Sequence, residues 1–486
     1  MTHPDHDTSR PRSPASDATE AQAAEPLGTP SSASAPIDAG DVIPFGQAVK
    51  AWFLISLQTF GGPAGQIAVM QRTLVDEKRW IGHRRFLHAL NYCMLLPGPE
   101  AQQLAIYTGW LLNGLRGGLV AGVLFVLPGM LALLGLSAVY VAYGDTPLLT
   151  GLFLGLSAAV IAIVLQAVVR VSRRALTHPA LIALAVSAFL ALTFFGIPFP
   201  IVILAAGLIG WALGRVWPAI TTPPAKKTAD DGPAPLIGDD QLHADQPSIR
   251  RSAIILAVGL TAWTLPILAV GVAFGWDSIF VDQALFFSGA ALVTFGGAYA
   301  VLSYVAQQAV NVYGWLLPGE MVRGLALAET TPGPLIMVVQ FVAFVGAYRS
   351  PGDLNPWTAA IIASLLVTWV TFVPCFLFVL LGAPYVERLR HNRSLTAALT
   401  GITAAVVGVI ANLAVYFAAH TLFTQSQDWS HGMMHAQIPV LASISLPAVA
   451  LTAVACLLIF VVRWSVLRAL GACAVLGILT QVILLR

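Results

Sequence analysis

Two identical tripeptides, Pro97-Gly98-Pro99 and Pro332-Gly333-Pro334, interrupt apolar segments of the sequence. Proline removes a backbone donor and its ring clashes with the preceding turn, so neither segment can form one continuous helix. A helix that restarts at the second proline leaves its first N–H groups free at the positive end of the helix dipole. Such a start binds anions without any arginine. The tripeptides therefore predict two anion-binding helix starts, which would suit a compact dianion.

Polar side chains flank both tripeptides. Glu100 and Gln102 follow the first tripeptide, and Glu329 and Thr331 precede the second. A carboxylate within an apolar segment needs a proton or a partner, so Glu100 and Glu329 are candidates to carry a coupling proton. At a helix start, Glu100 could instead only stabilise the dipole. The amide and hydroxyl groups could bind the oxygens of an oxyanion or satisfy freed backbone groups.

The composition predicts the surroundings of these segments. Of the 486 residues, 57% are hydrophobic and only 10% are charged, whereas soluble domains carry about 25% charged residues. Apolar runs at 118–140, 149–169 and 395–419 are long enough to cross a hydrocarbon core of about 30 Å as helices. They do not alternate apolar and polar residues as barrel strands would. The sequence therefore predicts an all-α polytopic membrane protein.

Composition and motifs also disfavour several kinds of chemistry. The net charge of +2 does not suggest a nucleic-acid partner. We expect no cofactor and no metal, because the cysteines are isolated within apolar segments and His431 and His435 of "HGMMH" are separated by a helix-weakening glycine. No lysine follows a glycine, so the phosphate loop GxxxxGK[ST] is missing. Paired aspartates occur only in a polar linker, which argues against an enzyme acting on lipid phosphates.

One membrane unit occurs twice in the sequence. "LQTFGG" at 57–62 matches "LVTFGG" at 292–297 at an offset of 235 residues, which also aligns the two Pro-Gly-Pro tripeptides. After an insertion the offset becomes 246, and residues 155–166 then align with 401–412. An ordered set of matches of this kind indicates a duplicated domain.

Basic residues predict that the two copies are inverted. Lys and Arg mark the cytoplasmic side in short loops. Residues 72–85 and 170–178 are rich in Lys and Arg, whereas the matching 307–320 and 416–424 contain none. The pattern reverses at 386–396, which contains three arginines. Inverted repeats with broken helices are a common architecture of secondary transporters, with the substrate site near the midplane.

These patterns predict the organisation of the chain. We expect a disordered cytoplasmic tail at 1–40, a first membrane repeat at 41–217, a cytoplasmic polar linker at 218–250, a connecting transmembrane helix at 251–276 and a second repeat at 277–486. Residues 86–112 are too short for two crossings, so they are expected to form a re-entrant hairpin. The segment 45–70, broken by Gly61-Gly62-Pro63, could re-enter or span.

The stretch from Phe60 to Gly129 closely resembles the chromate ion transporter family in its long-chain, two-domain form. It begins "FGGPAGQIAVMQRTLVDEKRW" and later contains "PGPEAQQ" and "FVLPG"; with the second copy the resemblance covers about 45–486 outside the linker. It implies a secondary transporter that exports chromate across the bacterial inner membrane and confers chromate resistance. Chromate is a tetrahedral dianion, which agrees with the helix-start prediction. The family's motif residues carry over to Phe60, Gly61, Gly62, Pro63, Arg79, Trp80, Pro97, Gly98 and Pro99.

Two departures from the family pattern limit what carries over. Family members often have His at the place of Gln66, which puts a proton relay through that position in doubt. The second copy has Ala298 in place of Pro63 and no basic cluster beside Trp315, so its role is expected to be more structural.

The expected site combines these residues. Lys78, Arg79 and Trp80 would attract or gate the anion at the cytoplasmic mouth, or the two cations would only set topology. The expected substrate-binding residues are Phe60, Gly61, Gly62, Pro63, Pro97, Gly98, Pro99, Glu100, Gln102, Gly296, Gly297, Thr331, Pro332, Gly333 and Pro334.

The expected partners are chromate or a related oxyanion, membrane lipid and a coupling ion such as the proton. The sequence is also compatible with a homodimer. Two alternatives stay open. The substrate could be sulfate or another tetrahedral oxyanion, because helix ends discriminate poorly between such dianions. The protein could also be an anion channel, which predicts currents without saturation or proton coupling.

Overall fold

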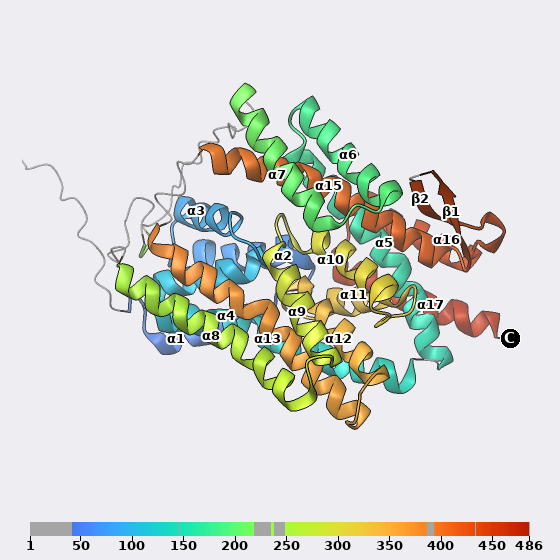
Figure 1. Ribbon diagram of the computed structural model, residues 1–486, viewed down its shortest axis with the longest axis horizontal. Coiled ribbons are helices and arrows are strands. Elements are labelled where there is room, and N and C mark those ends of the chain that lie inside the picture. The colour runs from blue at the N-terminus through green and yellow to red at the C-terminus, as the bar shows by residue number, and fades with distance from the viewer. Residues whose placement is uncertain are drawn as a thin grey trace, which may run out of the picture. The chain divides into compact units, whose positions relative to one another are not determined.

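The computed structural model describes residues 41–144, 146–217, 235–237, 248–385, 393–432 and 434–485, and nearly all of their elements are helices (Figure 1). Seven of the described helices are long and apolar enough to cross a membrane. Two described strands, β1 (Ser426–His431) and β2 (Met434–Pro439), pair antiparallel as a hairpin. The prediction of an all-α polytopic membrane protein is confirmed. The tail at 1–40 and most of the 218–250 linker lie outside the described residues.

The first half places short helices before long ones. Its elements are α1 (Phe45–Ser56), α2 (Gly62–Gln71), the π-helix η1 (Arg72–Glu77), α3 (His83–Cys93), α4 (Glu100–Tyr143), α5 (Pro147–Ala175), α6 (Pro179–Phe195) and α7 (Phe199–Val216).

The second half follows α8 (Ile249–Phe274), which lies where the connecting helix was predicted. Its helical elements are α9 (Ile279–Leu292), α10 (Ala298–Gln307), the π-helix η3 (Gln308–Val312), α11 (Glu320–Thr330), the 3₁₀ turn η4 (Leu335–Met337), α12 (Val338–Arg349), α13 (Pro356–Gly382), η5 (Ala383–Tyr385), α15 (Arg393–Leu422), η6 (Leu441–Ser443), α16 (Leu446–Cys456), the π-helix η7 (Leu457–Val461) and α17 (Val466–Leu484).

Local sequence signals explain where several of these helices begin. Proline occupies the first turn of α5, α6 and α13, where its missing N–H has no partner within the helix. The Asn355 side chain accepts a hydrogen bond from the Trp357 amide at the start of α13. The His178 ring does the same for the Ala180 amide at the start of α6. Such caps satisfy N–H groups that the helix itself leaves free.

The order of elements in the second half follows that in the first. α2 passes into η1, and α10 passes into η3. Both α3 and α11 lead into a Pro-Gly-Pro turn. The long helices α5 and α15 contain the segments 155–166 and 401–412, which align at the offset of 246 found in the sequence. The inverted orientation of the two copies in a membrane remains a prediction.

Glycine contacts pack the last helix of each half against the other half. α17 lies along α5, and α7 lies along α15. A Cβ on Gly477 would come within 2.5 Å of the Gly155 backbone nitrogen, and one on Gly401 within 2.5 Å of the Gly210 Cα. Glycine permits this approach between helices that cannot rely on a hydrophobic driving force in lipid. Equivalent pairs of glycines therefore hold the two halves together in equivalent places.

The 44-residue element α4 is not one straight helix. Asn113 and Gly114 leave the helical conformation, and Gly114 has a φ of 60°. A Cβ on Gly109 would collide with the backbone of Gly117, eight residues later, which a straight helix would hold well away. The chain therefore reverses, and the residues before Asn113 form with α3 the helical hairpin expected at 86–112. Its re-entrant placement in the membrane remains a prediction.

The first glycine-rich segment, "LQTFGG" at 57–62, also separates two helices. α1 ends at Ser56, and α2 begins at Gly62 after Gly61, whose φ is 77°. The segment 45–70 therefore does not form one unbroken helix, and both alternatives for its placement in the membrane, re-entry and a single span, stay predictions. At the first tripeptide, α4 begins at Glu100 rather than at Pro99, because Pro99 has an extended ψ of 105°. The expectation that the helix restarts on the proline itself was wrong by one residue.

We expect Gly109→Val to destabilise the protein, because its side chain would meet the Gly117 backbone. Overpacking of this kind typically lowers the free energy of unfolding by about 1–3 kcal/mol. Gly135→Val lies in the same element but has open space around its Cβ, so it is the matched control. Unfolding of both purified variants in one detergent would measure the difference. Equal stability of the two variants would contradict the reversal at Asn113.

Candidate functional site

Two backbone hydrogen bonds bring the Pro-Gly-Pro turns and the Thr-Phe-Gly-Gly segments together. The Gly98 amide donates to the Thr294 carbonyl at 2.8 Å. In the reciprocal contact, the Gly333 amide donates to the Thr59 carbonyl at 2.9 Å. Each interrupted turn of one half is thus held by the segment of the other half that precedes its double glycine. The four motifs that the sequence analysis singled out meet at one interface between the halves.

The glycines of both turns are required by conformation and by space. Gly98 and Gly333 have φ values of 122° and 101°, which L side chains rarely adopt. A Cβ on Gly98 would lie 2.8 Å from the Cys375 sulfur. Gly129, the last residue of "FVLPG", faces the Pro332 carbonyl so closely that a Cβ there would collide with it. The later family motif therefore makes room for the second turn.

Amide side chains bind the carbonyls that these turns expose. The buried Gln66 donates from Nε2 to the Gly333 carbonyl at 2.5 Å. Gln103 donates from Nε2 to the Pro97 carbonyl at 2.7 Å. A buried carbonyl without a partner destabilises the fold, so these bonds stabilise the irregular backbone. Gln66 serves as a structural donor here, and an amide cannot carry a proton relay.

The start of α4 offers donors without partners. Pro99 is its N-cap, and no side chain among the described residues caps this start. Gln102, in the first turn, is fully buried, and neither polar atom of its amide has a partner among the described residues. Free N–H groups at a helix start attract anions. Gln102 adds to these groups a side-chain donor that the fold leaves unused.

The second turn leads into a different helix start. Pro334 precedes the 3₁₀ turn η4, which continues into α12. Thr331 is buried, and its hydroxyl donates to the Ala328 carbonyl at 3.0 Å. Its proton is therefore already used within α11. Met337 aligns with Gln102 at the offset of 235 residues, so the second start has an apolar side chain where the first has an amide.

The double glycines begin the two neighbouring helices. Gly61 is the N-cap of α2, and Pro63 lies in the first turn of that helix. Gly297 is the N-cap of α10, with a φ of 107°, and Gly296 has a φ of 73°. Gly62 lies beside Tyr299, because a Cβ on Gly62 would be 3.5 Å from the Tyr299 hydroxyl. The starts of α2 and α10 therefore lie close to each other. Phe60, which precedes Gly61 and α2, is half-buried.

The two candidate carboxylates differ in their surroundings. Glu329 is 1% exposed, and its Oε1 accepts a hydrogen bond of 2.5 Å from Tyr299. Its Oε2 has no partner among the described residues. Glu100 is half-buried at the start of α4. Two arginines, Arg170 and Arg174, lie near the end of α5 with exposed side chains.

The expected cytoplasmic mouth contacts the linker. Lys78 is exposed, and its Nζ lies 5.0 Å from the centre of the buried Trp80 ring. The Leu236 amide donates to the Arg79 carbonyl at 3.1 Å, and the Ile237 amide to the Trp80 carbonyl at 3.0 Å. Linker residues are therefore docked beside these three positions.

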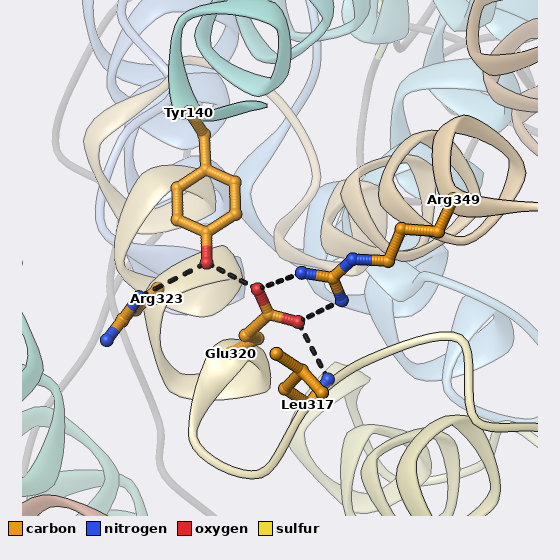
Figure 2. Close-up of polar contacts among 5 residues, drawn as sticks. All are labelled: Tyr140, Leu317, Glu320, Arg323 and Arg349. Atoms are coloured by element: carbon orange, nitrogen blue, oxygen red, sulfur yellow. Dashed lines mark hydrogen bonds and ion pairs between the residues drawn. The ribbon is translucent and has the colours of Figure 1, made fainter. Parts of the chain in front are cut away.

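The sequence analysis missed an ion pair that joins the two ends of the second helical hairpin, which α11 and α12 form. Figure 2 shows Arg349, at the end of α12, holding both oxygens of Glu320 at the start of α11 at 2.6 and 2.8 Å. The Tyr140 hydroxyl and the Leu317 amide also donate to this carboxylate at 2.6 and 2.7 Å (Figure 2). Arg323 donates to the Tyr140 hydroxyl at 3.3 Å. The signal in the sequence was one acidic and one basic residue at the two ends of an apolar hairpin.

We expect Glu320→Gln to destabilise the protein by about 2 kcal/mol, because it removes the charge from a largely buried bidentate pair. Arg349 is 38% exposed, so water would partly replace the lost partner. Glu77→Gln is the matched control, since it breaks the exposed Arg72–Glu77 contact of 3.4 Å, which should change stability by less than about 1 kcal/mol. Denaturant unfolding of both variants in the same detergent would show whether the brace contributes.

Comparison with known proteins identifies relatives that match both halves of the chain. A family model described as "Chromate transporter" matches residues 46–211 and 281–478. A chromate transport protein of Pseudomonas aeruginosa is 34% identical over 360 residues, which cover 73% of this chain and 76% of that protein. A chromate transport protein of Cupriavidus metallidurans is 28% identical over 366 residues, covering 75% and 80%. No solved structure matches the chain significantly.

Proposed function

The chain belongs to the chromate transporter family, and from this premise we propose that it exports chromate from the cytoplasm as a secondary transporter. The names of the relatives support chromate as the transported anion. We place the protein in a bacterial inner membrane, with the tail and the linker in the cytoplasm and with export giving chromate resistance. The basic loops of the first half support this orientation.

The unpartnered Gln102 amide at the start of α4 is the observation that carries the proposed site. A buried amide without partners is unfavourable unless it serves a ligand. Beside it, the free N–H groups of the helix start supply donors and a positive dipole. A tetrahedral dianion presents oxygens in several directions, so it can accept bonds from both sources. The bond from Gly98 to Thr294 holds this start at the interface between the halves.

The position of the interface supports transport by alternating access. Halves that rock against each other expose a central site first to one side and then to the other. The reciprocal bonds at Gly98 and Gly333 lie where such a motion would be centred. Glu329 is the proposed site of proton coupling, because it is buried at this interface with one oxygen unpartnered. A bound proton would remove the carboxylate charge that opposes a dianion nearby.

We expect Gln102→Met to abolish chromate export without preventing folding. Met337 occupies the equivalent position in the second half, so the same scaffold already accepts a methionine there. Loss of hydrogen bonds to a charged ligand should weaken chromate binding about 10- to 100-fold. Chromate accumulation would be measured at matched expression in cells without their own exporter. Sulfate accumulation is followed in parallel.

The outcomes of this experiment are distinct. If the intact chain lowers cellular chromate and Gln102→Met does not, the export proposal and the site are both supported. If chromate is unchanged while sulfate responds, the proposed substrate is wrong. Export that survives both Gln102→Met and the double variant Pro97→Ala, Pro99→Ala would leave chromate as the substrate but reject the helix-start site.

We expect Glu329→Gln to uncouple transport from the proton gradient, because the amide cannot release a proton. Chromate uptake into inside-out membrane vesicles would be measured with and without an imposed pH difference. In the intact chain the pH difference should accelerate uptake, whereas in Glu329→Gln it should have no effect. The control Asp353→Asn changes an exposed carboxylate on the connection between α12 and α13. A response to pH that persists in Glu329→Gln would exclude this residue as the coupling site.

A further inference from the structure

A polar cavity of about 570 Å³ lies beneath the β1–β2 hairpin. Its walls come from α6, α10, η3, α15 and the hairpin itself. The lining includes the side chains of Ser303, Gln307 and Asn311 from α10 and η3, together with Asn412 and Tyr416 from α15. All five carry hydrogen-bonding groups without a fixed charge. These groups can hydrogen-bond a solvated polar ligand, although apolar residues such as Leu192 and Val415 also line the cavity.

A polar stripe connects this cavity with the centre of the molecule. Tyr299, Ser303 and Gln307 follow each other at intervals of four residues, which places them on one face of α10. The stripe begins at Tyr299, whose hydroxyl is bonded to Glu329. Exposure increases along it, from Ser303 at 8% to the exposed Asn311 in η3. The stripe thus runs from the proposed coupling carboxylate to the cavity.

Hydrogen bonds fix part of the cavity wall and leave one group free. Thr193 of α6 donates to Asn412 Oδ1 at 2.9 Å, and Asn412 donates to Ser303 Oγ at 3.0 Å. These bonds join α6, α15 and α10 around the cavity. The Tyr416 hydroxyl is buried and has no partner among the described residues. A buried polar group without a partner is unfavourable, and no described residue supplies the partner that this hydroxyl lacks.

The equivalent place in the first half is cationic. At the offset of 246 residues, Tyr416 aligns with Arg170 and His420 with Arg174. Both arginines lie near the end of α5, where their side chains are exposed. Neither Lys nor Arg is among the described residues that line the cavity of the second half. One scaffold therefore carries two guanidinium groups in the first copy and uncharged or titratable groups in the second.

We propose that the cavity beneath the hairpin is the vestibule through which the transported oxyanion leaves, and that Arg170 and Arg174 form the opposite, capturing vestibule. The inference rests on the proposed function and deepens it. Guanidinium groups concentrate anions at a mouth and bind them by charge-assisted bonds, which are about twice as strong as neutral ones. Hydroxyl and amide groups guide the anion but hold it weakly, so it dissociates readily.

Other charged or titratable groups at the cavity are consistent with release of the anion there. Asp428 of β1 lies in the lining, where its charge repels an anion. His420 and His435 also lie in the lining, and His420 Nδ1 is 2.9 Å from the Tyr416 carbonyl. The asymmetry between the two vestibules favours capture at the basic side and release at the hairpin side, which is the direction of export.

The position of the vestibule can be tested without any transport. Asn311→Cys and Arg174→Cys would be treated with a membrane-impermeant maleimide in right-side-out and inside-out vesicles. Three of the native cysteines are buried, and the unmodified chain gives the background. We expect Asn311→Cys to react only from outside and Arg174→Cys only from inside. Reaction of Asn311→Cys from the inside, or from neither side, would overturn the proposal.

The role in release is tested by giving the outer vestibule the charge of the inner one. In Tyr416→Arg we expect the half-saturation concentration for chromate applied from outside to fall at least about fivefold, since a charge-assisted bond is gained. The rate of chromate efflux should fall by a similar factor. Gln425→Arg adds the same charge to an exposed position outside the cavity lining and should leave both quantities unchanged.

Failure of this inference differs from failure of the proposed function. If the intact chain moves chromate but Tyr416→Arg binds and releases it as the intact chain does, the release vestibule is wrong and chromate transport stands. If the intact chain moves no chromate, the proposed function fails, whereas the labelling result still decides whether the cavity opens to the outside.

Discussion

Hydrogen bonds between two interrupted backbones hold the centre of this protein together. The amides of Gly98 and Gly333 each bind a threonine carbonyl of the opposite half, and both glycines adopt a positive φ that other residues would resist. In lipid, no water is available to satisfy backbone groups freed by a broken helix. Each interruption is therefore possible only because the other half supplies its partner. Each copy of the Pro-Gly-Pro motif thus contacts the Thr-Phe-Gly-Gly motif of the opposite half.

The proposed site is built from neutral donors rather than fixed cations. Gln66 and Gln103 stabilise the turns, and Gln102 remains available at the start of α4. A buried arginine at this depth would bind a dianion strongly and would need its own partner whenever the site is empty. Helix dipoles and amides carry no net charge, so an empty site leaves no buried ion without a counter-charge. The arginines Arg170 and Arg174 lie instead near the end of α5, where we propose the entrance to the site.

The two halves share a scaffold but differ in the charges that they carry. The second hairpin is closed by the Glu320–Arg349 pair. The end of the first hairpin is anchored instead by Asn113, which donates to the Ile43 carbonyl at 2.7 Å. Where Arg170 and Arg174 stand at the end of α5, Tyr416 and His420 stand in α15. A duplicated unit can thus keep its packing, through equivalent glycine contacts, while its polar groups diverge.

Composition and motif order by themselves determined the helical membrane class, the positions of both interruptions and the doubled order of motifs. These features are local: proline breaks a helix wherever it stands, and a long apolar run needs a helix in lipid. The sequence also indicated Glu329 and Gln102, because polar residues are rare within such runs. Only the tertiary structure decided which residues meet. The bond from Gln66 to Gly333 spans 267 positions, and Glu320 finds Arg349 only when α11 and α12 fold back together. Such contacts depend on how helices pack, and no local pattern of residues encodes that arrangement.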